Sequence, residues 1–133
     1  MNTELIEGLI SGAPLPSLLG IRLDRCDKDV AVLRMPFKEQ LVTIADVVHG
    51  GAISALIDTT ATAAAWATDE LPENMRGTTV ALTVNFLTAA RATDLTATGR
   101  VVRRGRSLCF LEVTVTAADG NAVATGLITY KLG

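Results

Sequence analysis

The sequence predicts an α+β protein in which an antiparallel β-sheet wraps around one long central helix. The stretch from Gly50 to Thr68 is rich in Ala, Ile and Leu, and its only charged residue is Asp58. A helix that is apolar on every side has to be enclosed by other elements. Four β-patterned segments follow this stretch and two shorter ones precede it, so we expect the sheet to enclose the helix.

The residues before the long helix predict a short helix and two strands. In Asn2–Ile10 the apolar side chains lie on one helical face, with Thr3 as the expected cap, and Pro14 and Pro16 are expected to end the helical region. Two apolar runs then flank a polar turn, which is typical of a hairpin. The runs are Ile21–Leu23 and Val30–Met35, and the turn is Asp27–Asp29.

The residues after the long helix predict a loop and four strands. The loop, Asp69–Gly77, contains Pro72, Asn74 and Gly77. The strands are rich in Val, Thr and Leu, and the Asp119–Gly120 pair is a strong hairpin signal. We expect strands at Thr78–Leu87, Leu95–Arg103, Ser107–Ala117 and Ala122–Leu132, with other turns at Arg91–Asp94 and Arg104–Gly105.

Length and composition predict one domain, residues 1–133, with an ordinary globular core. The chain has 49% hydrophobic residues and a net charge of -2, so it carries no general bias toward nucleic acid or membranes. Cys26 and Cys109 lack the spacing of a metal site and are expected in or near the core. The N-terminus lacks the pattern of a secretory signal, which predicts a cytoplasmic location. A central Asp also argues against a membrane span at Gly50–Thr68.

Asp58 is unusual because Asp is a poor helix former, and an unpaired charge in apolar surroundings is costly. The same segment begins with His49, Gly50 and Gly51, where free N–H groups at a helix N-terminus suit a carbonyl oxygen that becomes negative. Asp58 lies eight residues beyond Gly50, which is roughly 12 Å along a helix. The two groups can meet at one bond only if two helices lie antiparallel across a two-fold axis, which predicts an obligate oligomer.

The chain resembles the hotdog-fold acyl-CoA thioesterases of the phenylacetate-pathway type, close relatives of the 4-hydroxybenzoyl-CoA thioesterases. The resemblance extends from about Leu19 to the C-terminus, and its most specific element is His-Gly-Gly with an Asp nine residues after the His. It rests on Val48–Gly51, on Leu56–Asp58, on Val80–Ala89 and on Val101–Arg106.

This resemblance implies a role for four residues. The backbone N–H of Gly50 would polarise the thioester carbonyl, and His49 would help to position the substrate or the leaving group. Asp58 of the partner subunit would act as nucleophile or as general base on water, and Thr79 would hold the attacking water. The alternatives are purely structural roles: a structural carboxylate at Asp58, a helix cap at His49, and close helix packing at the glycines.

Other residues are implied in substrate binding. Gly51 and Thr43 would line the site, although Thr43 stands where relatives usually carry Asn or Gln, and Asp46 stands where they commonly carry Gly. Cations gather near a predicted turn, which suits the phosphates of coenzyme A. The residues implied there are Arg104, Gly105, Arg106 and Ser107, with Arg103 less favoured by its strand phase, and Trp66 is expected in the core or an interface.

The implied activity is hydrolysis of an acyl- or aryl-CoA to the free acid and coenzyme A, without a metal or an organic cofactor. The implied assembly is a homodimer or homotetramer, with no nucleic-acid or membrane partner. Two alternatives stay open at this point. The chain could be a hotdog dehydratase or hydratase acting on 3-hydroxyacyl thioesters, or a non-catalytic module that binds acyl-CoA.

Overall fold

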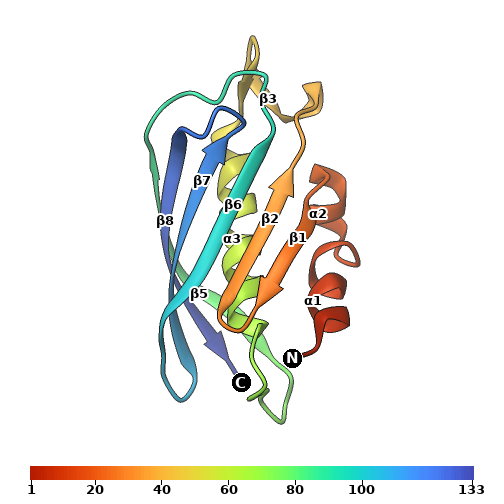
Figure 1. The fold of residues 1–133 in the computed structure, drawn as a ribbon, viewed down its shortest axis with the longest axis vertical. Coiled ribbons are helices and arrows are strands. Elements are labelled where there is room, and N and C mark those ends of the chain that lie inside the picture. The colour runs from red at the N-terminus through yellow and green to blue at the C-terminus, as the bar shows by residue number, and fades with distance from the viewer.

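A six-stranded antiparallel sheet curls around helix α3 (Gly50–Trp66) in the computed structural model, which describes residues 1–133 (Figure 1). Two short helices, α1 (Thr3–Ile10) and α2 (Pro14–Leu19), lie beside the sheet edge formed by β1. The strand order is β1-β2-β6-β7-β8-β5 and every neighbouring pair is antiparallel. The strands are β1 (Arg22–Asp27), β2 (Val30–Met35), β5 (Gly77–Phe86), β6 (Leu95–Arg104), β7 (Leu108–Ala117) and β8 (Ala122–Leu132). The expected hotdog architecture is therefore confirmed.

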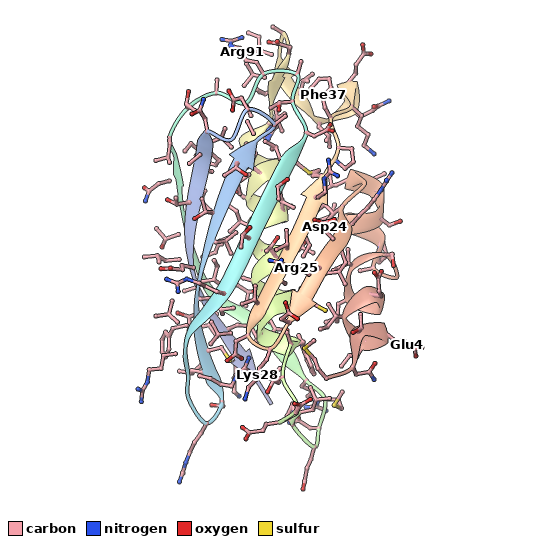
Figure 2. All side chains as sticks on the ribbon, in the orientation of Figure 1. Glu4, Asp24, Arg25, Lys28, Phe37 and Arg91 are labelled. Atoms are coloured by element: carbon pink, nitrogen blue, oxygen red, sulfur yellow. The ribbon has the colours of Figure 1, made fainter.

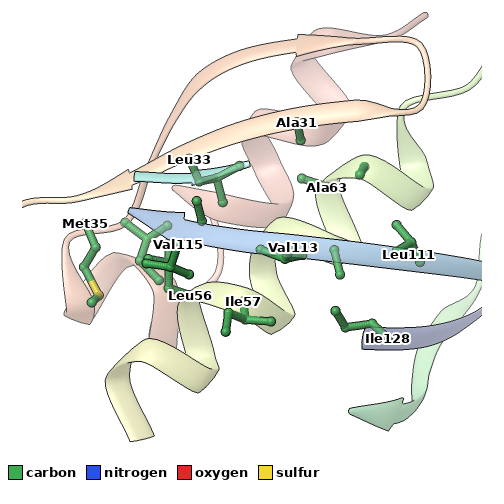
Figure 3. Packing of buried hydrophobic residues seen from close by; sticks show 14 of the residues in the cluster. Ala31, Leu33, Met35, Leu56, Ile57, Ala63, Leu111, Val113, Val115 and Ile128 are labelled. Carbon is green, nitrogen blue, oxygen red and sulfur yellow. The ribbon is translucent and has the colours of Figure 1, made fainter. Parts of the chain in front are cut away.

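The core lies between α3 and the inner face of the sheet. Because side chains alternate between the two faces of a strand, every second residue of the central strands points at the helix. Leu33 of β2, Val113 and Val115 of β7, and Leu56 and Ile57 of α3 are all nearly inaccessible to solvent and pack together (Figure 3). Full burial of such a side chain contributes about 1.5–3 kcal/mol. Charged side chains, among them Glu4, Asp24, Arg25 and Lys28, lie at the surface instead (Figure 2).

Helix α3 is enclosed on three sides rather than all round. Its large apolar residues and all its alanines except Ala55 are buried, but one stripe stays partly exposed to solvent. The stripe follows helical spacing and includes Asp58. We name it the open stripe: Ser54, Ala55, Asp58, Thr59 and Thr62. The expectation of a fully wrapped helix is thus only partly right, because the curled sheet ends at β5 before it closes over this side.

The N-terminal region differs from the expectation at two points. Asn2 caps α1 in place of Thr3, because its Oδ1 accepts the N–H of Leu5 at 3.2 Å. Pro14 starts the second helix α2 instead of ending the helical region, since proline at the first helical position lacks an N–H that would be unpaired there anyway.

Three short elements were not predicted from the sequence. A 3-10 turn at Glu39–Leu41 leads into a small hairpin of β3 (Val42–Ile44) and β4 (Val47–Val48), directly before α3. The elements are only two or three residues long, too short to show a period. None of the helices combines the length and apolar character that crossing a membrane requires.

The close packing of α3 against the sheet predicts that a larger residue at Gly126 of β8 destabilises the protein. A Cβ added there would lie 2.7 Å from Cγ2 of Ile57, closer than real Cβ atoms approach. Gly126→Ala should therefore lower the free energy of unfolding by about 1–3 kcal/mol, as overpacking does. The matched control is Gly8→Ala in α1, where a Cβ meets nothing within 4 Å and should stabilise by about 0.5–1 kcal/mol. Urea denaturation measures both, and equal stability of the two variants would contradict the packing argument.

Candidate functional site

Asp58 lies on the open stripe of α3, directly beside strand β5. The hydroxyl of Thr79 donates a hydrogen bond of 2.6 Å to Oδ1 of Asp58, and both side chains are partly buried. No group within the chain donates to Oδ2 of Asp58 or pairs with its charge. The bond orients the carboxylate and leaves one oxygen free, which is the arrangement that a nucleophile or a general base requires. The structure thus brings together two of the residues implied in catalysis.

His49 caps the N-terminus of α3. Its Nδ1 accepts the N–H of Gly51 at 2.7 Å, and its own backbone N–H donates to the carbonyl of Leu41 at 2.7 Å. A ring nitrogen that accepts a hydrogen bond carries no proton, so the proton of neutral His49 is on Nε2. The N–H of Gly51 is occupied by this bond, whereas the N–H of Gly50 has no acceptor within the helix. Gly50 is therefore the residue that can donate to a carbonyl oxygen at this end.

Gly50 and Asp58 lie eight residues apart on one rigid helix, roughly 12 Å along its axis. A single chain therefore does not bring the free carboxylate oxygen and the free N–H to one bond. This separation agrees with the spacing expected from the sequence.

A shallow hollow of about 380 Å³ opens beside Gly50. The ring of Phe86, at the end of β5, lies against Gly50, because a Cβ added there would be 3.2 Å from Cζ of Phe86. Thr43 of β3 lines the hollow, as implied from the sequence, whereas Phe86 was not singled out. An isolated aromatic at a strand end carries no sequence signal, so only the fold could identify it. The lining comprises Thr43, Val47, Val48, Gly50, Ile53 and Phe86–Ala90.

Asp46 holds the hairpin next to this hollow. Its carboxylate pairs with Nη1 of Arg91 at 3.1 Å, and its carbonyl accepts the N–H of Ala92 at 2.8 Å. Arg91 lies at the end of the molecule that carries β3 (Figure 2). The preceding Ala45 has a φ of 51°, a left-handed conformation that few residues adopt. The departure from the family pattern at Asp46 thus has a structural consequence, the attachment of the hairpin to the loop after β5.

Arg104 lies at the opposite end of α3. Its guanidinium pairs with Oδ1 of Asp29 at 2.7 Å and donates to the carbonyl of Ala65 at 3.0 Å. A cation at a helix C-terminus satisfies unpaired carbonyls and interacts favourably with the helix dipole. Arg104 also contacts the thiol of Cys109, and burial raises the pKa of that thiol more than the nearby guanidinium lowers it. Arg104 is therefore a structural clamp on the helix, and its implied contact with phosphate stays a prediction.

Arg106, like Arg103, is an exposed cation of this cluster. Together with Gly105 and Ser107 it lines a hollow of about 230 Å³, into which Glu70 also faces. No acidic side chain of the chain pairs with Arg106, so its charge is available for an anion. The same end of the helix carries Trp66, whose Nε1 donates to the Tyr130 hydroxyl at 2.9 Å in the core. Burial raises the pKa of Tyr130.

The two arginines predict different outcomes on substitution. Arg104→Gln should lower the free energy of unfolding by about 1–3 kcal/mol, since it leaves Asp29 and the carbonyls of α3 without their partner. Arg106→Gln, at an exposed and unpaired position, should change stability by less than about 0.5 kcal/mol. Thermal or urea denaturation of both variants checks this, and a stable Arg104→Gln protein would show that the clamp is dispensable.

Comparison with known proteins identifies relatives of the chain over nearly its whole length. Residues 45–124 match the thioesterase superfamily. Acyl-coenzyme A thioesterase 13 of Homo sapiens is 26% identical over 133 residues, which cover 98% of this chain and 93% of the relative.

Two solved structures share the fold. A thioesterase family protein from Silicibacter pomeroyi has a TM-score of 0.88 at 28% identity and covers 98% of each chain. The E. coli PaaI protein from the phenylacetic acid degradation operon has a TM-score of 0.78 at 23% identity, covering 88% of this chain and 82% of its own.

Proposed function

Because the chain belongs to the thioesterase superfamily and is a PaaI-like thioester hydrolase of the hotdog fold, we propose that it hydrolyses an acyl- or aryl-coenzyme A. In this proposal Asp58 of one subunit and the Gly50 backbone N–H of its partner act on the same thioester. The observation that carries it is the oriented carboxylate of Asp58, held by Thr79 on the open stripe with one oxygen free. The name of the human relative, which refers to acyl-coenzyme A, supports the substrate class.

An unpaired sheet edge supports the dimer. Strand β5 is the last strand of the sheet and pairs only with β8. Val80 is 58% exposed and Leu82 is 39% exposed in the single chain. A long apolar edge of this kind readily pairs with another strand. The open stripe of α3 lies on the same side, so one partner copy would cover both.

Two contacts within the chain also support a position for the proposed two-fold axis. Asp58 of α3 contacts Thr79 of β5, and Gly50 of α3 contacts Phe86 of β5. The helix and the strand therefore run in opposite directions. Ser54 is midway between Gly50 and Asp58 on the helix, and it lies beside Leu82, which is about midway along the strand between the two contacts. A two-fold axis at this point makes both α3 and β5 antiparallel to their partners. It brings each Asp58 to the partner's Gly50 and creates two equivalent sites.

The chemistry needs only groups that these two elements supply. The thioester carbonyl accepts the N–H of Gly50 at the positive end of α3, which stabilises the oxyanion that forms. Asp58 either removes a proton from a water held by Thr79 or attacks the carbonyl carbon itself. In the first route the water oxygen bonds to the acyl carbon, the C–S bond breaks, and the coenzyme A thiolate takes up the proton held by Asp58. In the second route attack by Asp58 expels the thiolate and leaves a mixed anhydride, which a water then hydrolyses to the free acid and Asp58, and the thiolate takes up the released proton. No metal or organic cofactor is required, and the leaving thiolate demands no strong general acid.

In this proposal the phosphates of coenzyme A would contact Arg106 and Ser107. Arg106 and Ser107 share a hollow with Glu70 and Leu71, which follow the C-terminal end of α3 at Trp66. Arg106 is exposed and unpaired. We extend the proposal to a homodimer at least, in a cytoplasmic location, with a tetramer as the further possibility that the sequence leaves open.

Substitution of Asp58 tests the catalytic role. Asp58→Asn keeps the size and can still accept from Thr79, but it removes the negative charge, so we expect thiol release to fall by about 10²–10⁴-fold. Asp46→Asn, at a half-exposed carboxylate near the N-terminal end of α3, should reduce it by far less. Release of free thiol from several acyl-CoAs measures activity, and light scattering confirms assembly. Full activity of a correctly assembled Asp58→Asn protein would exclude the mechanism, and saturable binding without thiol release by the wild type would favour a binding module.

Complementation between two inactive variants tests the shared site. Gly50→Pro removes the N–H at a position where proline suits the helix, and Asp58→Asn removes the carboxylate. Each homodimer should be inactive, whereas the mixed dimer contains one site with both native groups. Co-expression should therefore restore about a quarter of wild-type activity, since random pairing makes half of the dimers mixed with one of two sites intact. Circular dichroism verifies folding, and an inactive mixture of folded variants that form mixed dimers would reject the site shared between two chains.

A further inference from the structure

The hollow beside Gly50 is apolar and carries no charged side chain in its lining. Its floor consists of core residues, since Val48 and Ile53 are each 3% exposed and Ala90 is 2% exposed. Its volume of about 380 Å³ lies in the range of small-molecule pockets. Arg91, which follows Ala90 of the lining in the sequence, is paired with Asp46. The hollow therefore offers a carboxylate or an ammonium group no partner.

Phe86 differs from the rest of this lining. One side of its ring lies against Gly50, with Cζ 3.2 Å and Cε1 3.4 Å from the place of a Cβ. The side chain is nevertheless 54% exposed, and the neighbouring Leu87 is 55% exposed. An aromatic side chain that is half covered loses much of the free energy that its burial would contribute. The exposed part of the ring faces the space next to the only free N–H at the tip of α3.

We propose that Phe86 is a specificity-determining residue and that the hollow binds an uncharged, apolar acyl group of the thioester. This inference rests on the proposed function, because the thioester carbonyl must accept the N–H of Gly50. With the carbonyl there, the first carbons of the acyl group lie against the ring that covers Gly50. Leu87, Val47 and Ile53 continue the apolar surface, so longer acyl groups bury more carbon.

The preference among acyl groups follows from the residues that line the hollow. Each methylene that leaves water contributes about a fourfold gain in binding. An acyl group ending in a carboxylate would lose its hydration without gaining a counter-ion. The hollow thus favours aliphatic or aromatic acyl groups over acetyl groups and over dicarboxylic acyl groups. Asp46 contributes indirectly, since it neutralises Arg91, the cation that would otherwise attract such a carboxylate.

The test compares acyl preference rather than activity alone. We would measure kcat/KM for acetyl-, butyryl-, hexanoyl-, phenylacetyl- and succinyl-CoA with the wild type, Phe86→Ala and Phe86→Leu. The wild type should prefer hexanoyl- and phenylacetyl-CoA. Phe86→Ala should lower kcat/KM for these two at least tenfold and for acetyl-CoA less than threefold, while Phe86→Leu retains the preference for hexanoyl-CoA.

A matched control and a check of assembly exclude indirect effects. Leu127→Ala removes another exposed apolar side chain, 63% exposed. Leu127 points away from the core because the next residue of β8, Ile128, is buried, so this variant should keep the wild-type profile. Light scattering follows the oligomeric state of each variant. The proposal would be overturned if Phe86→Ala lowered kcat/KM equally for every acyl-CoA or left the acyl preference unchanged. A wild-type preference for succinyl-CoA would also overturn it.

A binding measurement separates this inference from the proposed function. In the Asp58→Asn background, calorimetry should show tighter binding of hexanoyl-CoA than of coenzyme A, and Phe86→Ala should abolish the difference. Absence of thiol release from every acyl-CoA would reject the proposed hydrolysis, whereas this difference in binding would still support the hollow. Equal binding of hexanoyl-CoA and coenzyme A in the Asp58→Asn protein would reject the hollow, even if the wild type is an active thioesterase.

Discussion

The enclosure of α3 by a single curled sheet is the constraint on which the other features of the molecule depend. Small residues along the helix, such as Ala61 and Ala64, let the strands approach closely, and Gly99 and Gly126 remove side chains where the strands face it. This close packing makes the helix a rigid rod. The positions of Gly50, Asp58 and the C-terminal end of α3, where Arg104 is bound, are therefore fixed relative to one another. No change of loop conformation within one chain can bring them together.

The same curled sheet leaves one side of the helix uncovered. Asp58 is located on that side, where its charge avoids the core and Thr79 supplies a hydrogen bond from the neighbouring strand. An unpaired edge strand beside an uncovered helix stripe is unfavourable in an isolated chain. Both become favourable when a second copy covers them. In the proposed dimer, the requirement for assembly and the requirement for two-chain chemistry are satisfied by the same surface.

The two ends of α3 are held by different means, which suit different tasks. At the N-terminus His49 satisfies the N–H of Gly51 and leaves that of Gly50 free, while Phe86 covers the glycine from the side. At the C-terminus Arg104 donates to the helix carbonyls and pairs with Asp29. Arg104, which the resemblance implied in phosphate binding, therefore has a structural role. Arg103 and Arg106 stay exposed and without an ion pair, and Arg106 also lines the hollow at this end.

The amino-acid sequence by itself determined the elements that depend on local pattern. The long apolar helix, the hairpin at Asp119–Gly120 and the strands β5 to β8 follow from periodicity and turn chemistry, and the spacing from Gly50 to Asp58 already predicted a second chain. Only the tertiary structure decided which side of α3 stays open, that Arg104 clamps the helix, and that Phe86 lies on Gly50. These depend on contacts between residues far apart in the chain, such as Gly50 with Phe86 and Asp29 with Arg104. No local period or spacing encodes such contacts, because they arise from the curvature of the sheet and the point at which it ends.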